Sequence, residues 1–170
     1  MSGIVRSVIL REPANALEPR MRTYWTTQGA IATLVAAGLV TAGTVIAATT
    51  GAETVAWIVG VLGALAVAVL AVSAVVIARL DYRHYRYEVT DVGLYVAKGW
   101  LWRRWQVVPH ARVQTVDTKA GPLLRAFGLV AVEVTTASSA GGTKIPGLRP
   151  PVADALVEDL ARRAELEEAT

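Results

Sequence analysis

The chain has 170 residues, no cysteine and a net charge of +3 at neutral pH. The missing cysteine excludes a disulfide framework, a thiol nucleophile and a cysteine metal site. Hydrophobic residues make up 54% of the chain and the mean hydropathy is +0.43, which is high for a soluble domain and indicates membrane segments. In a membrane protein, a mild basic excess reflects topology before it reflects nucleic-acid binding.

Residues 1–28 are expected to form a cytoplasmic lead-in before the first long apolar run. The early apolar piece IVRSVIL is short and is broken by Arg6, so it fits a cleavable signal peptide poorly. The section REPANALEPR has two prolines and charges of both signs. We interpret it as part of the cytoplasmic lead-in, with a short amphipathic turn.

Two long runs without a charged residue follow, at 29–49 and 55–78. At about 1.5 Å per helical residue, each reaches roughly 30 Å or a little more, which is enough to cross the hydrocarbon of a bilayer. One such run could be a buried helix of a soluble protein, but two neighbouring runs favour membrane spans. The connection TGAET is too short for a domain, so residues 29–78 predict an antiparallel transmembrane hairpin. Neither span contains an ionisable group, which disfavours a channel or a pump.

Basic residues lie before the first span and after the second span, whereas the connection between the spans has no basic residue. They are Arg6, Arg11, Arg20 and Arg22 before the first span, and Arg79, Arg83 and Arg86 after the second. Cytoplasmic segments carry an excess of Lys and Arg. The sequence therefore predicts a multi-pass protein of the cell (plasma) membrane with both termini in the cytoplasm.

From residue 79 to residue 170 the pattern changes to short alternating segments, which predict a cytoplasmic antiparallel β-domain. The expected strands are YRYEVT, LYVAKG, WLWRRWQVV, ARVQTVDTKAG, LVAVEVTTA and TKIPGL. The segment GPLLRAFG fits one or two helical turns, and SSAGG fits a hairpin loop.

The C-terminal segment RPPVADALVEDLARRAELEEA predicts a helix, because two prolines suit its start. Val152, Leu156, Leu160 and Ala164 form an apolar stripe at four-residue spacing. The expected fold is therefore α+β. A two-helix transmembrane hairpin is followed by a small antiparallel β sandwich or barrel that the C-terminal helix caps.

Three of the five tryptophans fall within six residues, in the stretch KGWLWRRWQVVPHARVQ at 98–114. As a strand, this stretch alternates two faces that are neither wholly polar nor wholly apolar, so some rings lack an obvious core. Packing in the sheet with solvated arginines is one reading, and contact with a partner or with lipid is the other. The candidate contact residues are Trp100, Trp102, Arg103, Arg104 and Trp105.

No pattern in the chain indicates catalysis, a cofactor or a metal. His84 and His110 are expected alone at strand edges, without a neighbour at metal-ligand spacing. No catalytic triad order, paired-carboxylate motif or nucleotide fingerprint is present, so we predict a protein that is not an enzyme. Nucleic acid is not an expected partner either, because residues 79–170 contain 13 basic and 11 acidic residues.

An ordered set of motifs resembles the YdbS-like bacterial pleckstrin-homology (PH) domain family of membrane proteins. These motifs are LEPRMRTYW at 17–25, VTDVGL at 89–94, GWLWRR at 99–104, VVPHARVQTV at 107–116, GPLLRAFGL at 121–129 and IPGL at 145–148. The resemblance covers roughly the whole chain. It implies two orthogonal antiparallel sheets capped by a C-terminal helix, and it carries over no catalytic residue.

Many eukaryotic PH domains bind phosphoinositides through a basic first hairpin loop, but the matching turn here, TDVG, is short and bears Asp91. The resemblance therefore favours a membrane-anchored PH-like interaction module. It is expected to dock a membrane-protein partner or a homologous PH-like subunit at the cytoplasmic face of the phospholipid bilayer. The alternative is a sensor or binder of the anionic lipid surface that uses the tryptophan and arginine strand.

Overall fold

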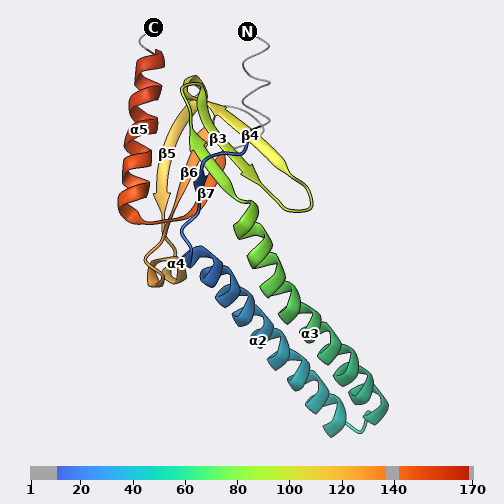
Figure 1. Ribbon diagram of the computed structural model, residues 1–170. Coiled ribbons are helices and arrows are strands. Elements are labelled where there is room, and N and C mark those ends of the chain that lie inside the picture. Colours follow the sequence, from blue (N-terminus) through green and yellow to red (C-terminus); the bar gives the residue numbers. More distant parts are fainter. Residues whose placement is uncertain (1–10, 137–141, 169–170) are drawn as a thin grey trace. The chain divides into compact units, whose positions relative to one another are not determined.

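The computed structural model describes residues 11–136 and 142–168 (Figure 1). By their contacts, residues 22–79 form one unit, and the segment up to Met21 joins the residues from Leu80 onward in a second. The first unit is helical and the second is built around two sheets. The predicted α+β composition, with two long apolar helices before an antiparallel β-domain and a C-terminal helix, is confirmed.

The helical unit consists of most of α2 (Arg20–Thr49) and α3 (Glu53–His84), which contain both predicted spans and extend beyond them. Small residues let the two helices approach closely. A Cβ atom added at Gly29 would collide with Ala74, and one added at Gly63 would collide with Val40. Their most apolar windows of 18 residues are 0% and 6% buried, so their large side chains face outward as lipid contact requires.

The first sheet has the order β1-β2-β3-β4 and is antiparallel throughout. Its strands are β1 (Asn15–Ala16), β2 (Arg86–Val89), β3 (Gly93–Lys98) and β4 (Arg104–Pro109). The prediction of an amphipathic turn in REPANALEPR is wrong at Asn15 and Ala16. Asn15 and Ala16 are extended because they pair with Tyr87 and Arg86.

The second sheet has the order β5-β6-β7 and contains β5 (Val113–Lys119), β6 (Val130–Thr136) and β7 (Thr143–Leu148). The 3-10 helix η1 (His110–Arg112) precedes β5, and the short helix α4 (Pro122–Ala126) lies between β5 and β6. Most of the segment SSAGG, predicted as the loop between β6 and β7, lies outside the described residues.

One ion-pair cluster ties the three strands of the second sheet together on its exposed side. The Glu133 carboxylate of β6 accepts from the Lys119 ammonium of β5 at 2.6 Å and from the Lys144 ammonium of β7 at 2.9 Å. The hydrogen bonds from these two ammonium groups lower the pKa of Glu133 to about 2. Glu133 is thus a link across the three strands.

The C-terminal helix α5 (Pro150–Glu168) packs against β5, β6 and η1, and Figure 1 shows it beside β5. Among the side chains described on this helix, Ala153, Leu156 and Leu160 are buried, with exposures of 0%, 8% and 0%. The predicted stripe began one residue too early, because Val152 is 39% exposed. The inward face follows spacings of three and four, which track the 3.6-residue helical period better than a uniform spacing of four.

The lead-in contributes to the core of the sheet unit, which the predicted division at residue 28 did not include. Leu17 and Met21 are each 2% exposed. The Glu18 backbone N–H donates to the Gly147 carbonyl at 3.2 Å, and the Met21 side chain lies against Gly147. Gly147 has a φ of +70°, so the close approach and the left-handed backbone both require glycine there.

Candidate functional site

The tryptophan hairpin, residues 99–105, is the end of the β3–β4 pair. The two strands pair from Gly93 with Pro109 to Lys98 with Arg104, and residues 99–103 form the loop between them. The predicted strand from Trp100 to Val108 is therefore wrong over its first four residues. Gly99 has a φ of +91°, and a Cβ atom there would collide with the Trp102 carbonyl, so this glycine turns the chain out of β3.

The loop exposes large apolar side chains that the strand prediction had assigned to two sheet faces. Trp102 is 85% exposed and Leu101 is 65% exposed, while Trp100 and Trp105 are 44% and 42% exposed. Trp102 therefore packs little against its own domain. Neighbouring apolar side chains exposed together on one loop are typical of a contact surface.

The two arginines of the hairpin differ in their partners. The Arg103 guanidinium donates to the Glu12 carboxylate, and it lies 5.7 Å from the centroid of the Trp105 ring. Among the described residues, Arg104 has neither a hydrogen bond nor an ion pair from its side chain, which is exposed. The sequence could not separate these two roles, because Glu12 and Arg103 are 91 positions apart.

Beside the hairpin is a hollow of about 700 Å³, which we call the basic hollow. It is lined by Glu12, Arg83, His84, Arg86, Trp100 and Arg103. Of the predicted contact residues it thus includes Trp100 and Arg103, and it does not include Trp102, Arg104 or Trp105. From the sequence, Arg83 and Arg86 were predicted only to mark the cytoplasmic side of the second span. No pattern in the sequence predicted that Glu12 lies beside them.

The electrostatics of the basic hollow act on its single carboxylate. The hydrogen bond from Arg103, followed by the charge of Arg103, lowers the pKa of Glu12, and the charges of Arg86 and His84 contribute in the same direction. The Nδ1 atom of His84 is 2.7 Å from the Leu80 carbonyl oxygen, so this nitrogen is the donor. His84 is the last residue of α3, and its predicted position in a strand is wrong.

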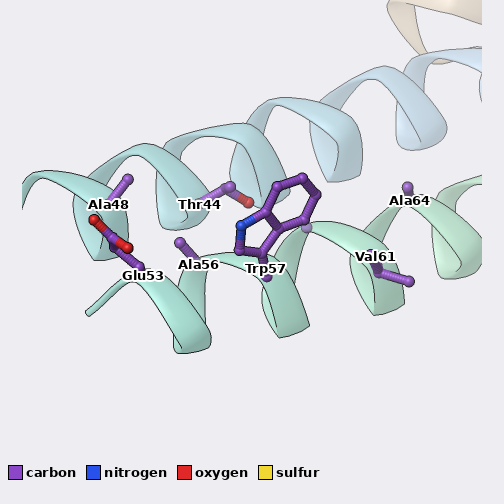
Figure 2. Close-up of a pocket in the computed structure, with 8 residues that line it drawn as sticks. Thr44, Ala48, Glu53, Ala56, Trp57, Val61 and Ala64 are labelled. Atoms are coloured by element: carbon purple, nitrogen blue, oxygen red, sulfur yellow. The ribbon is translucent and has the colours of Figure 1, made fainter. Parts of the chain in front are cut away.

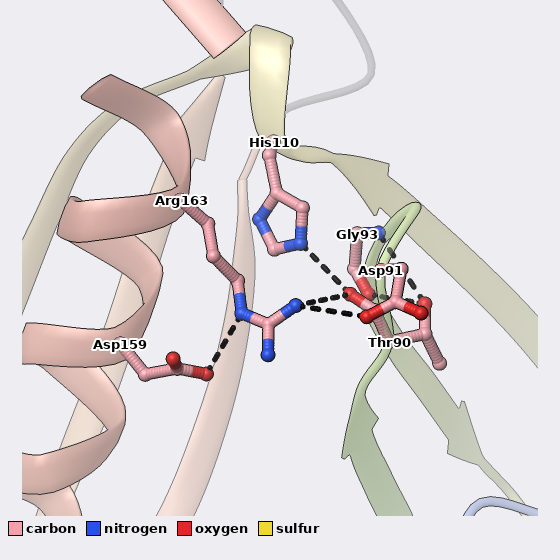
Figure 3. A network of polar contacts seen from close by, with 6 residues as sticks. All are labelled: Thr90, Asp91, Gly93, His110, Asp159 and Arg163. Atoms are coloured by element: carbon pink, nitrogen blue, oxygen red, sulfur yellow. Dashed lines mark hydrogen bonds and ion pairs between the residues drawn. The ribbon is translucent and has the colours of Figure 1, made fainter. Parts of the chain in front are cut away.

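A second polar cluster surrounds His110, where the sequence gave no role (Figure 3). His110 is 2% exposed, and its Nε2–H donates to the Thr90 carbonyl at 2.9 Å. Arg163 of α5 contacts Asp91 at 3.2 Å and Asp159 at 3.1 Å. The cluster connects the β2–β3 turn to α5 and η1. In this turn, which lacks basic residues, Asp91 is the ion-pair partner of Arg163.

The helical unit has a separate apolar hollow of about 450 Å³, with Trp57 and Thr44 among its lining residues (Figure 2). Apart from Thr44 and Glu53 its lining is apolar, and it brings no set of polar groups together. Within the described ranges, no three His, Cys, Asp or Glu side chains gather where they could hold a metal ion.

Comparison with known proteins shows the family of the chain and a curated relative. The family described as "Bacterial PH domain" matches residues 26–164. The chain is also similar to the UPF0699 transmembrane protein YdbS of Bacillus subtilis (strain 168). The two are 34% identical over 110 residues, which are 65% of this chain and 68% of that protein. No solved structure gives a significant match.

Proposed function

The chain belongs to the bacterial PH domain family of membrane proteins, as its motifs predicted, and from this premise we propose that it is a membrane-anchored interaction module. Its PH-like domain docks a membrane-protein partner or a homologous PH-like subunit at the cytoplasmic face of the plasma membrane. The observation that carries the proposal is the exposure of Trp102 and Leu101, at 85% and 65%, on the loop of a hairpin.

Two physical arguments support a protein partner. Tryptophan and arginine are enriched among the few residues that contribute most of the binding energy at protein interfaces, and both types meet in this hairpin. The spans also confine the domain to the membrane that holds its partner. Such confinement raises the effective concentration of each protein for the other, so a small apolar patch is enough for binding.

The alternative, attraction of the hairpin to an anionic lipid surface, uses the same residues in a different way. Lipid attraction adds about 1 kcal/mol for each basic group near the surface, and salt screens it over a Debye length of about 8 Å. Docking depends on a few aromatic anchors instead. The spans already attach the domain to the membrane, so further lipid affinity would add little.

In-cell photocrosslinking tests the docking proposal. A photoreactive residue at position 101 is expected to capture one membrane protein or a second copy of the chain. A photoreactive residue at the exposed position 111 is expected to capture neither. Trp102→Ala should abolish the adduct at position 101, because truncating an anchor costs about 2 kcal/mol or more, which is roughly 30-fold in affinity.

The matched control is Trp57→Ala, which removes a tryptophan that is 75% exposed in the helical unit. This change should leave the adduct at position 101 intact. Three results would contradict the proposal: lipid adducts alone at position 101, an adduct that survives Trp102→Ala, or an adduct lost only with Trp57→Ala.

The proposed topology makes a second prediction. Because the arginines flank the spans and the connection has no Lys or Arg, Thr50 should face outward and Ala111 should face the cytoplasm. In intact cells, an impermeant thiol reagent is expected to label Thr50→Cys and not Ala111→Cys. The native chain has no cysteine, so it serves as the blank. After cell lysis both variants should react. Labelling of Ala111→Cys alone in intact cells would show that the orientation is opposite to the predicted one.

A further inference from the structure

We propose that the basic hollow binds a phosphate-bearing anion. In the unliganded protein, the carboxylate of Glu12 occupies part of this anion-binding site. The inference concerns a site and a ligand class different from the docking of a protein by Leu101 and Trp102. Either proposal can fail without the other.

The lining of the hollow has the chemistry that phosphate recognition requires. Three arginines, Arg83, Arg86 and Arg103, line the hollow together with a single carboxylate, that of Glu12. They come from the last turn of α3, from β2 and from the hairpin loop, so the fold gathers them from three elements. A guanidinium presents paired N–H groups that match two phosphate oxygens at once.

Part of this donor capacity has no partner among the residues that the structure describes. The Arg83 side chain has no hydrogen bond or ion pair with any described residue. Arg86 donates from one nitrogen to the Tyr85 carbonyl at 2.9 Å, and no described residue forms an ion pair with it. A ligand with several anionic oxygens would satisfy these groups.

Glu12 behaves as an anion that the hollow already attracts. It donates nothing and accepts from Arg103, and the positive charges around it lower its pKa. Its side chain is 64% exposed, and exposed ion pairs are weak because water competes for both partners. A phosphate group, which offers several acceptor oxygens to the arginines at once, can therefore displace it, which makes Glu12 an internal competitor for the site.

Two sources of the phosphate group fit the position of the hollow. Arg83 is five positions after Ala78, the last residue of the predicted second span. Even a fully extended chain covers at most about 18 Å over that length, so lipid headgroups of the same bilayer are within reach. A free phosphorylated compound of the cytoplasm carries the same chemistry.

The test uses the full chain in nanodiscs of uncharged phosphatidylcholine, titrated separately with inorganic phosphate and with short-chain phosphatidylglycerol, and followed by calorimetry. Arg83→Gln is expected to weaken binding about tenfold, because it removes a charge-assisted contact. Its control, Arg104→Gln, removes an equally unpaired arginine outside the hollow and should change the affinity less than twofold.

The competitor role predicts a gain of affinity. Glu12→Gln should tighten binding several-fold, whereas Glu158→Gln, which makes the same charge change at an exposed site on α5, should have no effect. Binding of phosphate alone identifies a free compound as the source, and binding of phosphatidylglycerol identifies a headgroup. No binding of either probe, or equal losses in Arg83→Gln and Arg104→Gln, would overturn the proposal in favour of diffuse surface charge.

Discussion

Replacement of Leu160 by alanine is expected to lower the free energy of unfolding of the PH-like domain by about 2–5 kcal/mol. Leu160 is 0% exposed on the inner face of α5, which packs against β5 and β6. Truncation removes buried methyl groups and leaves a cavity that the surrounding strands fill only in part. A loss of this size is a large fraction of the stability of a small domain.

Hydrogen exchange of the β6 and β7 amides in the full chain, in mild detergent, measures this loss, because such core amides report the opening of the whole domain. Leu166→Ala is the control on the same helix, since Leu166 is 64% exposed, and it should change the free energy by about 0.5 kcal/mol or less. If exchange in Leu160→Ala equals that of the native chain, α5 does not close the core.

Leu17→Ala is expected to have an effect of the same size, about 2–5 kcal/mol, although Leu17 precedes the first span. Leu17 is 2% exposed, and its carbonyl oxygen accepts from the Tyr82 hydroxyl at 3.4 Å. The neighbouring Glu18 binds Gly147 through its backbone and Arg149 through its side chain at 3.0 Å. The lead-in is thus anchored to β7 and to the residue that follows it.

The same exchange measurement applies, with the β7 amides as the most direct report. Leu101→Ala is the control, because Leu101 is 65% exposed on the hairpin loop and its truncation leaves no cavity. Unchanged exchange in Leu17→Ala would show that the domain is complete without the lead-in, as the predicted boundary at residue 79 implied.

The candidate site shows how much a local sequence pattern can predict and how much it cannot. The run of tryptophans and arginines predicted a strand with rings that lack an obvious core, but alternation alone could not tell a strand from a loop. The pairing of Lys98 with Arg104 and the left-handed Gly99 decide that Trp100 to Arg103 leave the sheet. The sequence could not predict the basic hollow, because Glu12, Arg83 and Arg103 are distant in sequence and come together only in the folded domain.

The sequence by itself predicted the two long apolar helices, because an uncharged run of more than 20 residues can satisfy its backbone in a bilayer only as a helix or within a closed barrel. It also determined the family, most of the strands and the C-terminal helix, since hydrophobic periodicity and turn residues act locally. Only the tertiary structure decided that Leu17 and Met21 belong to the core of the β-domain and that Glu12 pairs with Arg103. The physical reason is that burial and charge pairing are properties of residues brought together by β-sheet pairing, and no local pattern encodes which distant residues those will be.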